Sequence, residues 1–300
     1  MKKNIFSALL AISALLFLTA CERPPIDAKQ NGFRGTAMVD VQNPRIVAEK
    51  VKLNTIPPSS GAISGEGEKA SKAYKNVQVL GDLSTAQFST FMVTMTSWVA
   101  PKEGCAYCHN LNNLADDSMY TKVVSRRMIE MTQNINANWK SHVQETGVTC
   151  YTCHRGNNIP QNVWFKSPPQ KGGNMLGNLN GQNNASPSAA YSSLPNETYS
   201  KFLLASNPAR IQGKDGLPNG NKHSILATEE VYGIMMHFSQ SLGVNCTYCH
   251  NTQAFSDWTH STPQRAQSWH AIQMVKDVNN TFMVPLTSTF PKHRLGETGD

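Results

Sequence analysis

Six of the seven cysteines in this 300-residue chain stand in three short blocks of the pattern Cys-x-x-Cys-His. Two thiols at this spacing can add across the two vinyl groups of one porphyrin, and the histidine that follows can ligate the iron from one side. We therefore predict three covalently attached haem c groups. The predicted residues are the cysteine pairs Cys105/Cys108, Cys150/Cys153 and Cys246/Cys249, with His109, His154 and His250 as axial ligands.

Three other uses of paired cysteines fit this pattern less well. An odd number of well-separated blocks, each ending in histidine, does not build tetrahedral zinc sites. A thioredoxin-like redox pair occurs once, in a βαβ context, and not in three copies. Structural disulfides, common in secreted chains, are disfavoured by the two-residue spacing within each block.

The composition indicates a loop-rich protein in which haem supplies part of the apolar core. Hydrophobic residues make up 39% of the chain and charged residues 16%, and the chain has 20 Gly and 16 Pro. The formal net charge is +7. The propionates of three haems would add roughly six negative charges and bring the mature protein near neutrality. A basic stripe with interleaved aromatic residues is missing from the sequence, so nucleic acid is not an expected partner.

The first 20 residues have the charged and apolar regions of a signal peptide. The apolar run of residues 5–18 is short for a spanning helix. Leu18-Thr19-Ala20-Cys21 resembles a bacterial lipobox, which predicts that Cys21 becomes the lipidated first residue of the mature chain. Ordinary cleavage that leaves a free thiol at Cys21 is the alternative. Either way, the body of the protein is expected outside the cytoplasm.

Residues 21–72 are rich in Pro, Gly and polar residues and predict an extended, lipid-anchored arm with little core, or a disordered segment. Beyond it, apolar residues recur at helical spacing. The predicted helices begin at Ser84 (with Gln87 in a capping box), at about Lys122, at Thr228 as N-cap and at Thr262-Pro263. The first ends before Pro101, the second near Trp139 and the third at Gly243.

The order helix, haem block, helix occurs twice, which predicts a mainly α, loop-rich multihaem cytochrome with two pseudo-repeated haem-binding halves. Residues 73–156 form the first half, which holds two haem blocks, and residues 223–300 form the second. Residues 157–222, crowded with Asn, Gly, Pro and Ser, are expected to connect them. The second half stops at Asp300, where a fourth block would be due, so we interpret it as incomplete.

Each iron also needs a second axial ligand or an open position. Methionines on the apolar faces of the predicted helices precede each block, but a methionine on such a face is more often core filler. The candidates are Met92, Met128 and Met235, with Met95, Met131, Met236 and His237 as competitors. His142 has no counterpart in the second half and is either a ligand or a solvated side chain.

Several longer stretches resemble the tetrahaem cytochrome c subunit of the photosynthetic reaction centre of purple bacteria. They are Arg126-Arg127-Met128, the run from Gly147 to Gly156, the run from Ser261 to Arg265, and Arg294-Leu295-Gly296. The resemblance implies that Met92, Met128 and Met235 are axial ligands and that His142 ligates a fourth haem. It implies four haems in a full-length protein, whereas this chain holds three blocks, so we expect a partial sequence or a trihaem variant. Arg265 matches a family arginine near the third haem, where a cation would favour reduced iron; a solvated arginine is the alternative.

The function implied by the resemblance is electron relay and not enzyme catalysis. A soluble periplasmic donor, either a small c-type cytochrome or a high-potential iron–sulfur protein, would reduce the haems. The haems would then reduce the photo-oxidised bacteriochlorophyll pair of the reaction-centre core. The expected location is the periplasmic face of the bacterial inner membrane, with anchoring through Cys21. The alternatives are a multihaem reductase and a haem sensor, each of which needs an open iron position.

Overall fold

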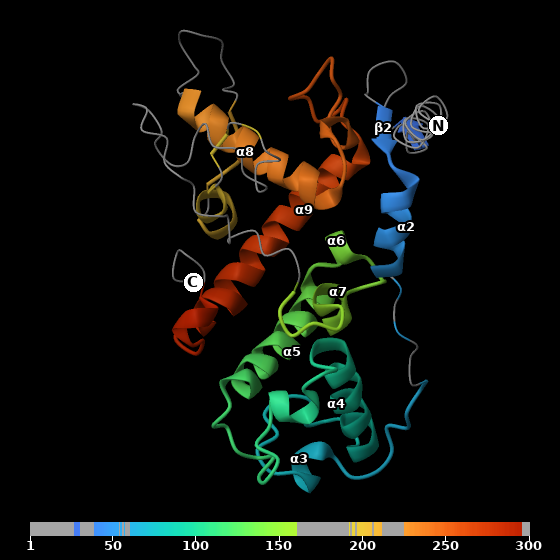
Figure 1. Cartoon of the computed structure of the whole chain (residues 1–300), viewed down its shortest axis with the longest axis vertical. Coiled ribbons are helices and arrows are strands. Elements are labelled where there is room, and N and C mark those ends of the chain that lie inside the picture. Colours follow the sequence, from blue (N-terminus) through green and yellow to red (C-terminus); the bar gives the residue numbers. More distant parts are fainter. Residues whose placement is uncertain are drawn as a thin grey trace, which may run out of the picture.

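The computed structural model describes residues 27–30, 39–53, 55, 57, 61–160, 192, 194, 195, 197–205, 207–211 and 225–295. The predicted signal peptide and Cys21 lie outside these residues. The described part is mainly helical and loop-rich, which confirms the predicted fold class. The helices of residues 70–154 and those of residues 225–277 form two groups that meet along the last long helix (Figure 1). Within the described residues, no helix is both long and apolar enough to cross a bilayer.

Helix α4 (Thr85–Val99) begins at the predicted capping box. The fully buried Ser84 hydroxyl accepts a hydrogen bond from the Gln87 backbone N–H at 3.2 Å, and the Gln87 side chain accepts one from the Ser84 N–H at 3.1 Å. The same hydroxyl donates to the Ser64 carbonyl at 2.9 Å. The cap therefore begins α4 and also holds the preceding loop, which includes the short helix α3 (Ala70–Ala73), against it.

Helix α5 (Tyr120–Asn138) lies within two residues of its predicted bounds and is followed directly by the short helix α6 (Lys140–Val143). Helix α7 (Cys150–His154) contains the second haem block and packs against α4. The backbone N–H of Gly156 donates to the Trp98 carbonyl near the end of α4 at 2.9 Å. Helix α4, which precedes the first block, is thus held against the second block, which follows α5.

Helix α8 (Ile225–Leu242) ends at Gly243 as predicted, but its start corrects the prediction. The helix begins at Ile225, so Thr228 lies inside it and is not the N-cap. Nothing in Ile225, Leu226 or Ala227 opposes helix formation, and the capping signal at Thr228 is therefore overridden. Helix α9 (Pro263–Asp277) begins as predicted, with proline at its first position. The chain then continues through η5 (Val278–Met283), η6 (Val284–Leu286) and η7 (Lys292–Arg294).

The predicted extended arm contains secondary structure. Strands β1 (Asp27–Gln30) and β2 (Val39–Gln42) pair antiparallel, with Asp27 opposite Gln42, and helix α2 (Pro44–Leu53) follows. The Asn43 side chain accepts a hydrogen bond from the Arg45 N–H at 3.0 Å, and Pro44 occupies the first helical position. This local start signal outweighs the Pro- and Gly-rich surroundings on which the prediction rested. Strand β2 also contacts the turn that carries the third haem block.

Part of the predicted connection belongs to the buried core. The π-helical turn η3 (Ser200–Leu204) places Phe202 and Leu203 against Val231 and Ile234 of α8. Phe202 is 3% exposed and Ile234 is fully buried. Residues of the predicted connection therefore contribute to the core, and the role of residues 157–222 in linking the two halves stays a prediction. Its apolar residues are few, and their burial depends on α8, which lies far along the chain.

The two helix groups are joined around Asp277 at the end of α9. Its Oδ2 accepts hydrogen bonds from Trp139 Nε1 and Asn134 Nδ2, each at 2.8 Å, and its Oδ1 accepts one from Thr281 at 2.8 Å. Burial alone would raise the pKa of Asp277, but these donors outweigh it and hold the pKa below its usual range. Beside this cluster, the Arg127 guanidinium donates to the Thr281 carbonyl at 2.5 Å and lies over the Phe282 ring.

Replacement of Asp277 by Asn is expected to lower the free energy of unfolding by about 1–2 kcal/mol near neutral pH, because charge-assisted hydrogen bonds become neutral ones. The folded-state pKa of Asp277 is lowered, so its stabilisation is present above the unfolded value of about 3.9 and is lost as pH falls through the folded value. Denaturant titrations at neutral and acidic pH measure both effects. The exposed Asp82→Asn is the matched control. Equal acid sensitivity of the Asp277→Asn variant and the native protein would contradict this role.

Candidate haem-binding site

Two of the three haem blocks line one large cavity. Cys105, Cys108 and His109 of the first block and Cys150, Cys153 and His154 of the second face a mainly apolar cavity of about 2040 Å³. Residues of α4, α5, α8 and α9 complete its wall. Typical small-molecule pockets occupy roughly 300–1,000 Å³, so this cavity has the size and apolar character that bulky macrocycles need. Of the described residues, those of the third block do not line it.

The first block lies on a 3-10 turn, η1 (Gly104–Tyr107), between α4 and α5. Gly104 adopts a φ of +67°, a left-handed conformation that lets the chain turn sharply after α4. The Cys108 thiol lies 3.2 Å from the Ser125 hydroxyl of α5. The Thr121 hydroxyl donates to the Tyr107 carbonyl within the block. Helix α5 therefore positions the second thiol of this pair.

The same contacts recur at the third block, on the 3-10 turn η4 (Cys246–Tyr248). The Cys249 thiol lies 3.3 Å from the Ser268 hydroxyl of α9, and the Thr262 hydroxyl donates to the Tyr248 carbonyl at 2.5 Å. These contacts are equivalent to those between α5 and the first block. The repetition of the two complete halves stays a prediction.

The second block differs because it is itself a helix. In α7 the Thr149 N–H donates to the Thr152 hydroxyl at 2.9 Å, which caps the turn. Arg155 adopts a left-handed φ of +50° directly after His154 and ends it. The pair of cysteines is thus presented to the cavity from a short rigid turn packed on α4.

All three block histidines have their Nδ1 atom within hydrogen-bond distance of a backbone carbonyl. The distances are 3.1 Å from His109 to Leu114 O, 2.9 Å from His154 to Asn157 O and 2.8 Å from His250 to Phe255 O. A carbonyl can only accept, so Nδ1 carries the proton and Nε2 keeps its lone pair for a metal. Burial lowers the pKa of His154 and of His250, which favours the same neutral ring. These residues therefore fit haem iron ligation, in which such an outer hydrogen bond orients the ligand.

The candidate methionines lie in two different environments. Met92 and Met128 both line the cavity, as do their competitors Met95 and Met131. In each case a threonine one turn later donates to the methionine carbonyl: Thr96 to Met92 O at 2.8 Å and Thr132 to Met128 O at 2.9 Å. Both helices therefore present candidate thioethers to the cavity that the first two blocks line, and the choice of ligand stays a prediction.

Met235 instead packs against the hydrophobic cluster of Phe202, Leu203, Val231 and Ile234. On the same helix, His237 lines the cavity, with its Nδ1 3.5 Å from the Tyr199 hydroxyl. Burial lowers the pKa of His237 to about 4, so the ring is neutral at physiological pH. The assignment of Met235 to the third haem stays a prediction.

The remaining predicted residues lie outside the cavity wall. The buried Nδ1 of His142 has no hydrogen-bond partner in the described part of the chain, unlike Nδ1 of the three block histidines, and its role as a ligand stays a prediction. Arg265 donates to the Asp257 carbonyl at 2.9 Å and the Ser261 hydroxyl at 2.7 Å, and it stacks 4.1 Å from the Trp258 ring centroid. The Arg265 side chain, at the start of α9, is therefore held against the loop after the third block instead of extending into solvent.

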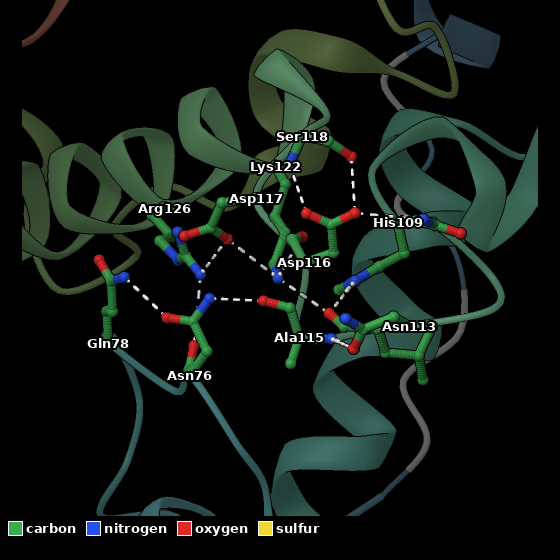
Figure 2. Close-up of polar contacts among 12 residues, drawn as sticks. Asn76, Gln78, His109, Asn113, Ala115, Asp116, Asp117, Ser118, Lys122 and Arg126 are labelled. Carbon is green, nitrogen blue, oxygen red and sulfur yellow. Dashed lines mark hydrogen bonds and ion pairs between the residues drawn. The ribbon is translucent and has the colours of Figure 1, made fainter.

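One buried residue at the first block was not singled out from the sequence. Lys122 lies at the start of α5, and its ammonium donates to the Leu114 and Asp116 carbonyls, both at 2.8 Å (Figure 2). It also pairs with Asp117 at 3.0 Å. A lysine near a helix start looks like a surface residue, and only the fold of the loop before it shows the burial.

A second cation completes this network. Arg126 donates to Asp117 at 2.8 Å and to the Asn76 carbonyl at 3.2 Å, and Asn76 donates to the Ala115 carbonyl at 2.6 Å (Figure 2). The Arg126 hydrogen bond, followed by those of Asn76 and Lys122, holds the pKa of Asp117 well below its usual range. The loop between the first block and α5 is thus held by buried cations and their acceptors.

The chain is similar to known proteins over nearly its whole length. A family described as "Photosynthetic reaction centre cytochrome C subunit" matches residues 22–300. A photosynthetic reaction center cytochrome c subunit of Rubrivivax gelatinosus is 50% identical over 99% of this chain and 81% of its own length. Proteins of the same name from Thermochromatium tepidum and Roseobacter denitrificans are 47% and 41% identical, over 96% and 89% of this chain and 71% and 75% of their own lengths.

Proposed function

Because the chain belongs to the family of photosynthetic reaction-centre cytochrome c subunits, we propose that it carries haem c on all three Cys-x-x-Cys-His blocks. As a member of this family it is an electron-transfer subunit that associates with the reaction-centre core on the periplasmic side of the membrane. A soluble c-type cytochrome or high-potential iron–sulfur protein donates the electrons, which pass to the photo-oxidised bacteriochlorophyll pair.

The arrangement of the block histidines carries this proposal. Each imidazole hydrogen-bonds through Nδ1 to its own backbone carbonyl, which leaves Nε2 for a metal, and each lies directly after a pair of thiols that can bind the same macrocycle. Bound haem supplies an iron that alternates between the ferric and ferrous states. The protein's part is to fix the ring orientations, exclude water with the apolar cavity wall, and tune the potentials.

Methionine ligation would close the second axial position. Met92 and Met128 face the cavity that contains the first two blocks, and this supports their assignment to the first and second haems. Met235 is proposed for the third haem from the family resemblance, although its side chain packs on the α8 core. His142 is proposed as a ligand for a fourth haem from the family resemblance. Arg265 is proposed to tune the third haem, whose histidine it faces across the Phe255 carbonyl.

Lipid attachment at Cys21 is proposed as the link to the membrane. The lipobox pattern and the otherwise unused seventh cysteine support it. More than one acyl chain is needed for stable anchoring, which an N-terminal lipoprotein cysteine provides. The mass of the mature N-terminal peptide decides the question, since an unlipidated terminus at another residue would exclude this anchor.

Carbon monoxide distinguishes an electron relay from the alternatives. In an electron relay every iron has two protein ligands, so the reduced native protein is expected to bind carbon monoxide slowly and incompletely. A reductase or sensor keeps an open position and binds it rapidly. Optical spectra after mixing measure the difference. Rapid stoichiometric binding at native pH would favour the reductase or sensor.

A further inference from the structure

We propose that Lys122 raises the reduction potential of the haem on the first block, acting through the Leu114 carbonyl on His109. Lys122 is a positioning residue in this scheme, because it touches neither the iron nor its ligand. The inference rests on the proposed function, since it requires haem attached at Cys105 and Cys108. It assigns a task to a buried charge that haem attachment alone does not explain.

The Leu114 carbonyl joins the two groups. It accepts the His109 Nδ1 proton at 3.1 Å and a Lys122 ammonium proton at 2.8 Å (Figure 2). A second bond, to the Asp116 carbonyl at 2.8 Å, fixes the ammonium in place. The Lys122 side chain is only 9% exposed, so water screens its charge weakly.

Two physical effects act in the same direction. An ammonium on the Leu114 carbonyl draws electron density from it and makes it a weaker acceptor for His109. The imidazole then gains less anionic character and donates less to the iron. The fixed positive charge also opposes the extra positive charge of ferric iron. Both effects favour the ferrous state and therefore raise the potential.

The counterion does not cancel this charge. Asp117 lies 3.0 Å from the Lys122 ammonium, but it also pairs with Arg126 at 2.8 Å, and its side chain is 37% exposed. Two cations thus share this partly solvated carboxylate. The Asp116 carboxylate also interacts electrostatically with Lys122, but it is hydrogen-bonded by Asn110 and Ser118. Of these charged groups, the Lys122 ammonium is the one joined to His109 through a shared carbonyl.

The third block shows the same geometry with a different cation. There the Phe255 carbonyl accepts the His250 Nδ1 proton at 2.8 Å and lies 3.5 Å from an Arg265 nitrogen. Arg265 also donates to the Asp257 carbonyl, as Lys122 does to the equivalent Asp116. A cation thus approaches the equivalent carbonyl in both blocks, from Lys122, one residue after Thr121, and from Arg265, three residues after Thr262. Lys122→Arg keeps the positive charge and is therefore the charge-conserving variant.

The test compares Lys122→Met with Lys122→Arg in the full chain, each with its haems attached. The haem mass on the first block is measured before any redox titration, and a block without haem would refute the proposed function itself. With haem in place, Lys122→Met is expected to lower the reduction equilibrium constant of one haem about tenfold, or about 59 mV for one electron. Lys122→Arg is expected to keep most of the native potential of that haem, and the potentials of the other haems should not change in either variant. An unchanged potential in Lys122→Met, or an equal loss in both variants, overturns the inference.

A second variant tests the effect of Lys122 on the haem potential if the Lys122→Met protein does not fold. Asp117→Asn removes the shared counterion and leaves both cations in place, so it is expected to raise the potential of the same haem. A purely structural role for the network predicts a fall or no change, and either result overturns the inference.

Discussion

A chain in which Cys150 and Cys153 are both replaced by Ser is expected to carry two covalent haems instead of three. Helix α7 presents this pair to the cavity it shares with the first block, and no thiol remains there to form a thioether. Intact mass after acid–acetone extraction measures the loss as one haem. The variant is also expected to unfold at lower temperature, because an apolar cavity would lose its contents.

Tyr151→Phe is the matched control, since it changes a residue between the two cysteines and keeps both thiols. It should retain three haems, and its unfolding temperature should change little, because only the ring contact to Trp98 is altered. If the double cysteine variant kept three acid-stable haems, covalent attachment at the second block would be refuted.

Met128→His is expected to lower the potential of the second haem strongly, by about a hundredfold in its reduction equilibrium constant, or about 120 mV. A thioether favours ferrous iron relative to imidazole, so replacing it by imidazole stabilises the ferric state. A redox titration followed in the haem α-band measures the change. The neighbouring Met131→Leu is the control, because Met131 lines the same cavity and is not proposed as a ligand.

The opposite response of the two variants would exchange the ligand and core roles of Met128 and Met131. If Met131→Leu shifted the potential and Met128→His did not, Met131 would be the ligand and Met128 core filler. The same pair of variants can be made at Met92 and Met95 on α4, where both side chains again line the cavity.

Elements with local start signals could be predicted from the sequence. The Ser84 capping box and Pro263 at the first position of α9 both lie where the pattern placed them, since their hydrogen bonds and fixed φ act over a few residues. The same kind of signal failed at Thr228, because a compatible run before it extended the helix. Asn43 and Pro44 form a helix start signal of the same kind, but the Pro- and Gly-rich surroundings favour a prediction of extended chain there.

Burial that depends on distant segments could not be predicted. Phe202 and Leu203 are core residues only because α8 lies over them. Lys122 is buried only because the loop after the first block folds back and offers it two carbonyls. The Cys-x-x-Cys-His blocks are evident from their spacing, and haem attachment at each of them stays a prediction. The carbonyl partner of each histidine could not be predicted, because it depends on the loop that follows.

Flash spectroscopy on membranes tests whether the haems of this subunit reduce the bacteriochlorophyll pair. With the haems chemically reduced beforehand, a single flash oxidises the bacteriochlorophyll pair. We expect the pair to be re-reduced with the same time constant as the haem α-band of this subunit is bleached, and this phase to be lost when the subunit is removed. Re-reduction of the pair without matching haem oxidation would refute electron transfer from this subunit.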